Sequence, residues 1–257
     1  MNFQTLANSS VSRETIQDEL RHTKNAIDFE LNSNTGDSFK PIEAEKFRFY
    51  PAVESAEWVD RLLKVGVKTV QLRIKDSQRE NLEEEIEKAI SLGREHGAQV
   101  FINDYWELAI KHGAYGVHLG QEDLIEASTS LIKSAGIRLG ISTHSFDEIL
   151  IAAKLKPSYI ALGHIFPTTT KDMPSQPQGL ARLRAYQKAV DHLSIRLGRD
   201  VPTVAIGGID LSNAKEVLSC GVDSIAVVRA VTQANNVELA VSLFNDLITE
   251  TRRRDDE

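Results

Sequence analysis

From residue 47 onward, short apolar runs rich in β-branched residues alternate with segments that have the spacing of amphipathic helices. Near-continuous apolar runs are typical of strands buried on both faces, as in a parallel sheet. Eight runs are predicted as strands: residues 47–53, 69–74, 99–103, 116–119, 138–142, 159–166, 203–207 and 224–229. Eight strand–helix units within about 200 residues favour a closed barrel over an open doubly wound sheet. We therefore expect an α/β chain with one (βα)8 TIM barrel domain over residues 47–250.

The segments between the predicted strands support this alternation. Residues 79–96 and 145–155 both repeat apolar side chains at helical spacing among charged ones. A third helix is predicted over residues 212–219, with Ser212 as its N-cap and Gly221 just beyond its end. No Gly-x-Gly-x-x-Gly motif follows the first strand, which weighs against a dinucleotide-binding fold.

Two segments fall outside the repeat. Residues 1–46 are polar, but four apolar residues at helical spacing predict one helix there: Ile16, Leu20, Ile27 and Leu31. We expect a solvated arm or an outer helix that closes the bottom of the barrel, with partner binding as the alternative. Residues 251–257 are predicted to form a charged, frayed tail.

Composition narrows the partners and the compartment. The chain has 257 residues, which fits one large domain, and its net charge of −7 weighs against nucleic acid or an anionic membrane as a partner. The single Cys220 excludes an internal disulfide and fits a reducing cytosol. The N-terminus lacks the apolar core of a signal peptide, and no apolar run reaches about 20 residues. We expect a cytoplasmic protein and leave open whether it forms a homo-oligomer.

Polar residues recur where the predicted strands end. A charged side chain on a buried strand has a small free-energy cost only at the end of the strand, where water, a metal or a ligand solvates the charge. In the second strand, Gln71, Arg73 and Lys75 share one face because side chains alternate with period two. An ion-pair network inside the barrel is the alternative, but three inward polar residues favour an anion site.

Two carboxylates follow neighbouring strands. Asn103 and Asp104 end the third strand, and Asp123 lies in the loop after the fourth. Mg²⁺ takes one or two carboxylates and completes its shell with water and phosphate oxygens. Alternatively, Asp104 caps a helix and Asp123 belongs to a turn. Together with the nearby cations, the pair predicts a magnesium site for phosphorylated small-molecule substrates.

A second anion site is predicted at the ends of the sixth to eighth strands, where hydroxyls, glycines and cations gather. Its residues are Thr168, Thr169, Thr170, Lys171, Gly207, Gly208, Val228 and Arg229. Glycines let backbone N–H groups approach a phosphate, and barrel phosphate sites commonly use these loops. Residues 167–180 form a long polar loop, which we expect to act as a lid.

The histidines carry less information. His118, His144 and His164 are each more often satisfied core residues than catalysts. Ser142 has no nucleophile-elbow motif around it, so a hydrolase triad is not expected.

Six segments in order resemble the thiamine-phosphate synthase family over residues 47–250. They are Gln71–Lys75, Ile102–Asp104, Gly116–Asp123, Gly140–Ser142, Gly163–Lys171 and Ala205–Ile209. The resemblance implies a transferase that joins 4-amino-5-hydroxymethyl-2-methylpyrimidine diphosphate to hydroxyethylthiazole phosphate. The products would be thiamine phosphate and pyrophosphate, formed through a dissociative, carbocation-like step.

The resemblance also implies a role for each site residue. Asp104 and Asp123 would bind Mg²⁺. The diphosphate would be held by Gln71, Arg73, Lys75, Asn103, Ser142 and Lys171, of which Arg73, Lys75, Ser142 and Lys171 would be catalytic. The thiazole phosphate would be held by Thr168, Thr169, Thr170, Gly207, Gly208, Val228 and Arg229. Arg229 departs from the family pattern, in which a small hydroxyl residue is expected.

Three other functions are compatible with a barrel of this kind. A thiazole tautomerase would bind the thiazole phosphate but would need no Mg²⁺–diphosphate site. A catalytically silent sensor of phosphorylated ligands would act through partners, and only the N-terminal extension supports it. A phosphosugar isomerase or aldolase would need a general base or a Schiff-base lysine in the barrel centre, where no candidate is evident.

Overall fold

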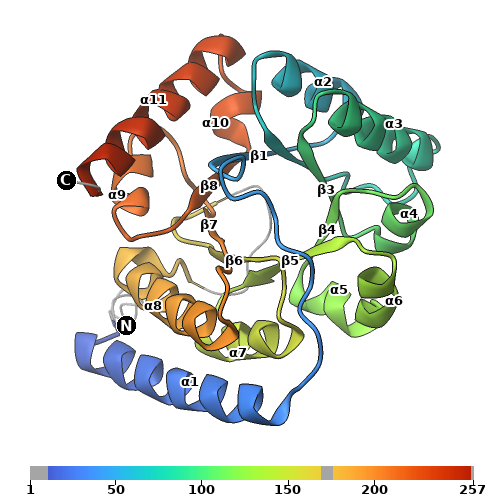
Figure 1. Ribbon diagram of the computed structural model, residues 1–257. Helices are drawn as coiled ribbons and strands as arrows, with labels where there is room; N and C mark the ends of the chain where they lie inside the picture. Colours follow the sequence, from blue (N-terminus) through green and yellow to red (C-terminus); the bar gives the residue numbers. More distant parts are fainter. Residues whose placement is uncertain (1–10, 169–175, 256–257) are drawn as a thin grey trace, which may run out of the picture.

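The computed structural model describes residues 11–168 and 176–255 and confirms the barrel. Eight parallel strands pair in sequence order, and β1 pairs with β8 to close the sheet (Figure 1). The strands are β1 (Phe49–Val53), β2 (Thr69–Leu72), β3 (Gln99–Asn103), β4 (Gly116–Leu119), β5 (Arg138–Thr143), β6 (Tyr159–Gly163), β7 (Thr203–Ile206) and β8 (Ser224–Val227). All eight coincide with predicted strands, although several are shorter.

Helices form the outer layer around this sheet (Figure 1). They are α2 (Ala56–Lys64), α3 (Leu82–Glu95), α4 (Trp106–Lys111), α5 (Gln121–Glu126), α6 (Thr129–Ser134), α7 (Phe146–Leu155), α8 (Gly179–Leu197), α9 (Ala214–Leu218), α10 (Arg229–Thr232) and α11 (Val237–Asp255). Because α11 runs to Asp255, it includes residues that the sequence predicted as a tail.

The helix predicted over residues 212–219 is shorter than expected. α9 begins after Asn213, and Ser212 is not its N-cap. The hydroxyl and backbone N–H of Ser212 instead donate to the Asp210 carboxylate, and Asn213 Nδ2 donates to the Gly208 carbonyl. These hydrogen bonds give polar groups of the turn after β7 partners within the turn and hold it beside the end of the strand.

Aromatic rings fill the lower half of the barrel. Phe47, Tyr50, Phe101 and Tyr159 are all buried and in mutual contact, with Tyr159 lying 4.8 Å from Phe47 and 5.0 Å from Phe101 between ring centroids. Gly140 makes room for them, because a Cβ there would lie 2.0 Å from the Tyr159 ring. The barrel floor is therefore packed, and the open space is left at the carboxyl ends of the strands.

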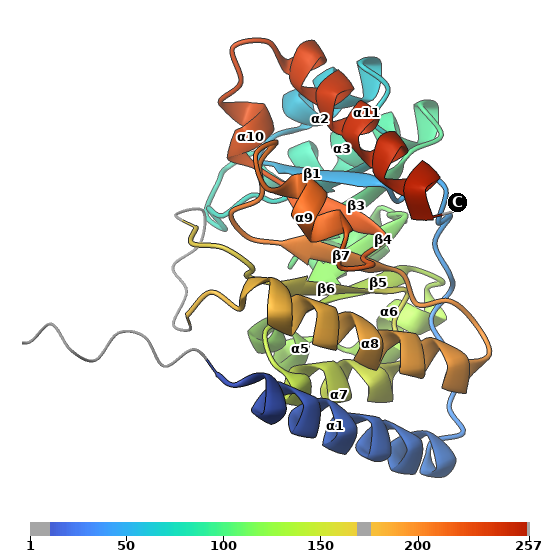
Figure 2. The ribbon, with the colours of Figure 1, turned by 90° about the vertical axis from the view of Figure 1, so that its left-hand side faces the viewer.

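The N-terminal extension forms helix α1 (Arg13–Ser33), which lies along the outside of α7 and α8 (Figure 2). The predicted apolar stripe is confirmed, since Ile16, Leu20 and Ile27 are buried against the barrel. Asp28 adds a salt bridge to Arg196 of α8, 2.9 Å away. The apolar stripe of α1 is therefore buried against the outer surface of the helical layer, where α7 and α8 lie.

The segment after α1 crosses to the bottom of the barrel. Lys156 Nζ donates to the carbonyls of Asn34 and Gly36 at 2.8 and 2.6 Å, which fixes the start of this segment. Ile42 and Phe47 then enter the aromatic cluster of the barrel floor. The connecting segment, and not the helix, therefore closes the bottom.

Candidate active site

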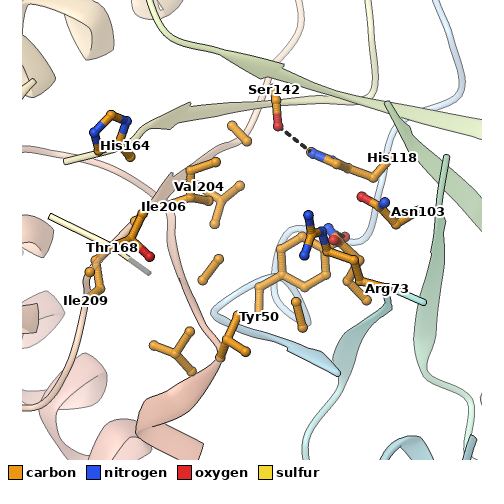
Figure 3. Close-up of a pocket in the computed structure, with 18 of the residues that line it drawn as sticks. Tyr50, Arg73, Asn103, His118, Ser142, His164, Thr168, Val204, Ile206 and Ile209 are labelled. Atoms are coloured by element: carbon orange, nitrogen blue, oxygen red, sulfur yellow. Dashed lines mark hydrogen bonds between the residues drawn. The ribbon is translucent and has the colours of Figure 1, made fainter. Parts of the chain in front are cut away.

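A pocket of about 520 Å³ opens at the carboxyl ends of the strands and is lined by residues of all eight. In Figure 3, Arg73, Asn103, His118 and Ser142 lie on one side of it, and Val204, Ile206, Ile209, Thr168 and His164 lie on the other. We call the first set, together with Gln71, the polar wall, and we call Val204, Ile206 and Ile209 the apolar wall. A charged group and an aromatic ring can therefore be held opposite each other.

The alternation predicted for the second strand is confirmed for Gln71 and Arg73. Gln71 and Arg73 line the pocket, whereas Leu72 and Ile74 are buried in the layer between sheet and helices. The Arg73 guanidinium makes no hydrogen bond or ion pair with the described residues and is available for a ligand.

Lys75 is exposed and does not belong to the pocket lining. β2 ends at Leu72, and beyond it the backbone N–H of Arg73 still donates to the Val53 carbonyl at 2.7 Å. Alternation of side chains holds only while the chain stays in the ladder. Lys75 lies two residues beyond Arg73, so the inward position predicted from the alternation does not extend to it.

Asp104 and Asp123 both line the pocket, as the sequence predicts. Asp104 follows β3 with a left-handed backbone (φ 66°), and the N-cap of α4 is Tyr105, so Asp104 does not cap that helix. Asp123 lies in the first turn of α5, where its Oδ2 accepts from the Gly120 N–H at 3.1 Å. Asp123 is therefore not the loop or turn residue that the sequence predicted, but an N-terminal residue of a helix that also lines the pocket.

The two carboxylates suit a hard divalent cation that takes most of its oxygens from a ligand and water. Among the described residues, no group of three or more histidine, cysteine, aspartate or glutamate side chains could hold a metal ion. A protein cage of the zinc or calcium type is therefore absent from the described part of the chain. A two-carboxylate magnesium site remains a prediction that fits the donor set.

The three histidines differ in their surroundings. His144 Nδ1 contacts a Glu148 carboxylate oxygen at 2.9 Å. His164 is buried, and its Nδ1 has no hydrogen-bond partner among the described residues. Burial, and to a lesser extent the nearby His144, lowers the pKa of His164, so its imidazole is held neutral.

His118 is the site residue that the sequence does not reveal. It is buried and satisfied, as expected of a core histidine, but it also lines the pocket and its Nε2 lies 2.8 Å from Ser142 Oγ. The one available signal is that His118 lies two residues after Gly116, on the inward face of the same strand.

The turn after β7 is glycine-rich for a steric reason. Gly207 and Gly208 have φ of 98° and 67°, and a Cβ on Gly208 would lie 2.5 Å from the Pro167 carbonyl oxygen. The loops after β6 and β7 therefore touch through their backbones. Thr168, Val228 and Arg229 line the pocket beside this turn.

Part of the second predicted anion site lies outside the described residues. This applies to Thr169, Thr170 and Lys171, and with them to half of the predicted 167–180 lid, residues 169–175. Within the described part of the chain, Arg229 is exposed at the start of α10, and its guanidinium makes no hydrogen bond or ion pair. Its guanidinium is therefore available to the pocket.

Fold and pocket together define a (βα)8-barrel protein whose site combines cationic, carboxylate and glycine-rich groups. The model of the family described as Thiamine monophosphate synthase matches residues 45–231. This chain belongs to that family.

Similar proteins agree with this assignment. The chain is 55% identical over 206 residues to the thiamine-phosphate synthase of Proteus mirabilis, covering 80% of this chain and 92% of that one. It is 58% identical over 205 residues to the thiamine-phosphate synthase of Pectobacterium atrosepticum, covering 80% and 93%. Among solved structures, thiamine phosphate pyrophosphorylase from Pyrococcus furiosus superposes with a TM-score of 0.68 at 32% identity, covering 81% of this chain and 98% of that one.

Proposed function

We propose that this chain is a thiamine-phosphate synthase. It would condense 4-amino-5-hydroxymethyl-2-methylpyrimidine diphosphate with hydroxyethylthiazole phosphate and release pyrophosphate. The observation that carries the proposal is the identity of more than half of the aligned residues with relatives of that name over most of their length. The pocket is consistent with it, because Arg73 lies on the polar wall and Thr168 lies on the opposite side of the same cavity.

The polar wall suits the diphosphate. Arg73 brings a guanidinium without a described protein partner, and Asn103 and Ser142 add polar groups from β3 and β5. Such donors stabilise the charge that develops on the departing pyrophosphate. Lys75 and Lys171 stay predicted contributors, the first from its exposed position after β2 and the second from outside the described residues.

Asp104 and Asp123 would hold Mg²⁺ at the same wall, and a bound magnesium ion would neutralise charge on the diphosphate. Both side chains line the same pocket as Arg73. They remain proposed ligands.

The apolar wall suits the aromatic rings of the substrates. Loss of pyrophosphate leaves a carbocation that the aminopyrimidine delocalises, and the thiazole nitrogen then captures it. Val204 and Ile206 would hold the rings in line and keep water away from the cation. This chemistry needs no Schiff-base lysine, and the described lining contains no lysine, which weighs against an aldolase.

The remaining expectations concern the setting of the enzyme. Every helix in the described ranges is too short or too polar to span a membrane. We propose a cytoplasmic location because the chain is acidic and has a single cysteine. A homo-oligomer stays a prediction, which light scattering on the purified chain would test.

Release of pyrophosphate tests the proposed function directly. We expect the purified chain to release pyrophosphate only when both substrates and Mg²⁺ are present, and to stop when EDTA is in excess. Asp104→Asn and Asp123→Asn should each raise the Mg²⁺ concentration needed for half-maximal rate. Asp246→Asn, the same charge change on the exposed face of α11, is the control. Release without the thiazole phosphate, or without Mg²⁺, would contradict the proposal.

A further inference from the structure

A continuous chain of hydrogen bonds runs through the barrel interior beneath the pocket. Gln71 Nε2 donates to the Tyr50 hydroxyl at 3.2 Å, and the Tyr50 and Tyr159 hydroxyls lie 2.8 Å apart. The Tyr159 hydroxyl lies 2.7 Å from His118 Nδ1, and His118 Nε2 lies 2.8 Å from Ser142 Oγ. Figure 3 shows the last of these bonds as a dashed line. We call these five side chains the relay; it joins the β2 and β5 sides of the polar wall.

The middle of the relay is sealed from water and stays protonated. Tyr50 is 1% exposed and Tyr159 is 0% exposed. Burial raises the pKa of each phenol well above its ordinary value, so both keep their proton. A neutral phenol donates one hydrogen bond, and a neutral imidazole donates from one nitrogen and accepts at the other. The direction of one bond in the relay therefore dictates the direction of the next.

With His118 taken as a neutral imidazole, two directions satisfy all the bonds with the same number of protons. In the forward direction, Tyr50 donates to Tyr159, Tyr159 donates to His118 Nδ1, and His118 Nε2–H donates to Ser142. The Ser142 hydroxyl proton is then available to the pocket. In the reverse direction, Ser142 donates to His118 Nε2, Nδ1–H donates to Tyr159, and Tyr159 donates to Tyr50. The Tyr50 proton then faces the pocket instead.

A phosphate oxygen at Ser142 distinguishes the two directions, because it accepts hydrogen bonds and cannot donate them. We propose that His118, Tyr159 and Tyr50 are positioning residues that make Ser142 a hydrogen-bond donor to the diphosphate. A bound anion selects the forward direction, with His118 as the Nε2–H tautomer. This inference rests on the proposed function, which places the diphosphate at Ser142, and adds residues that the function alone does not require.

The packing around His118 suits such a role, because the ring has little freedom to turn. It stacks on Tyr159 with 5.6 Å between centroids and 21° between planes. Tyr159 is in turn held in the space left by Gly140, on the strand that carries Ser142. Both ring nitrogens therefore keep their partners. A change from the reverse to the forward direction moves protons along the bonds, takes up one proton from the pocket at Ser142 and releases one at Tyr50, and it turns neither ring.

The tautomer of His118 can be observed in the unmodified enzyme. We would record long-range ¹H–¹⁵N correlations of the ¹⁵N-labelled chain at fixed pH, without ligand and with inorganic pyrophosphate and Mg²⁺. We expect the Nε2–H tautomer of His118 when pyrophosphate is bound. A bound state with the Nδ1–H tautomer would overturn the inference. The experiment needs no variant that could fail to fold.

A pair of His118 variants adds a functional readout. The glutamine of His118→Gln places its amide near the Nε2 position and can still donate to Ser142, whereas His118→Asn reaches only the Nδ1 position. We expect kcat/KM for the pyrimidine diphosphate to fall about tenfold in His118→Asn, as for loss of one bond to a charged group. His118→Gln should recover most of it, and KM for the thiazole phosphate should stay unchanged in both.

Tyr159→Phe removes the central hydroxyl and keeps the ring. We expect the same selective loss toward the diphosphate, with thermal unfolding measured for each variant. Equal losses toward both substrates that follow the fall in Tm would indicate a structural role and overturn the inference. If wild-type protein neither binds pyrophosphate nor converts the two substrates, the proposed function is wrong, and this inference, which rests on it, is wrong as well. If wild-type protein turns over but the two His118 variants behave alike, only the relay fails.

Discussion

Gly208 offers a sharp test of how the turn after β7 contributes to the site. Its φ of 67° is a left-handed conformation, which costs a residue with a Cβ about 1–2 kcal/mol. A Cβ there would also lie 2.5 Å from the Pro167 carbonyl oxygen and 2.8 Å from Phe166 Cβ. Because backbone must move to relieve the first contact, overpacking adds about 1–3 kcal/mol. We expect Gly208→Ala to lower the free energy of unfolding by about 2–5 kcal/mol.

Gly198 is a matched control for this substitution. Its φ is 64°, but nothing lies within 4 Å of the position of its Cβ. Gly198→Ala therefore carries the backbone cost of about 1–2 kcal/mol without the collision, and lowers Tm by a few degrees. Denaturant unfolding of both variants would separate the two contributions. If Gly208→Ala destabilised the chain no more than Gly198→Ala, the close approach of the two loops would be refuted.

The same substitution should affect one substrate more than the other. Gly208 belongs to the proposed thiazole-phosphate side, and displacement of Pro167 also shifts Thr168. We expect KM for the thiazole phosphate to rise in Gly208→Ala while KM for the pyrimidine diphosphate changes little. Gly198→Ala should leave both KM values unchanged, because it lies at the end of α8 and outside the pocket lining.

Two further predictions concern Arg229 and helix α1. Arg229→Ser should raise KM for the thiazole phosphate by up to about fivefold, since an exposed charge pair is worth about 0.2–1 kcal/mol, and the effect should shrink in added salt. Arg184→Ser, on the exposed face of α8, should show neither change. Ile27→Ala should cost about 2–5 kcal/mol of unfolding free energy, because Ile27 is 0% exposed, while kcat/KM is retained. Phe29→Ala, at a side chain that is 71% exposed, should cost little, and equal losses in the two α1 variants would refute the packing of α1 on the barrel.

The number and order of the strands could be predicted because parallel strands are buried on both faces. A strand buried on both faces appears in the sequence as a continuous apolar run, whereas a helix of the outer layer has apolar residues only at helical spacing. Both ends of β3 and β4 were predicted correctly, but several other strand ends were not, since residues beyond the last ladder bond keep the same composition. β6 was predicted to reach residue 166 but ends at Gly163. Lys75 shows the consequence, because its inward orientation was inferred from a ladder that ends at Leu72.

Charged residues of the proposed site that lie at strand ends could be identified from the sequence, whereas the proposed positioning residues could not. Asp104, Asp123 and Arg73 stand out because a charge beside a buried strand needs a reason. Tyr50, His118 and Tyr159 are ordinary core residues by type, and their contacts depend on register across the barrel. His118 pairs with Gly140 and Gly140 with Tyr159, which no local pattern reveals.

The position of α1 also bears on the order in which the chain can assemble. Asp28 of α1 meets His192 of α8 across 164 positions in sequence. As the chain leaves the ribosome, the docking surface of α1 is complete only after both α7 and α8 have been made. Contacts so distant in sequence form late, because the intervening loop must close first. Helix α1 is thus made before the helices that it packs against, and its complete docking requires the barrel to be built as far as its sixth strand–helix unit, β6 and α8.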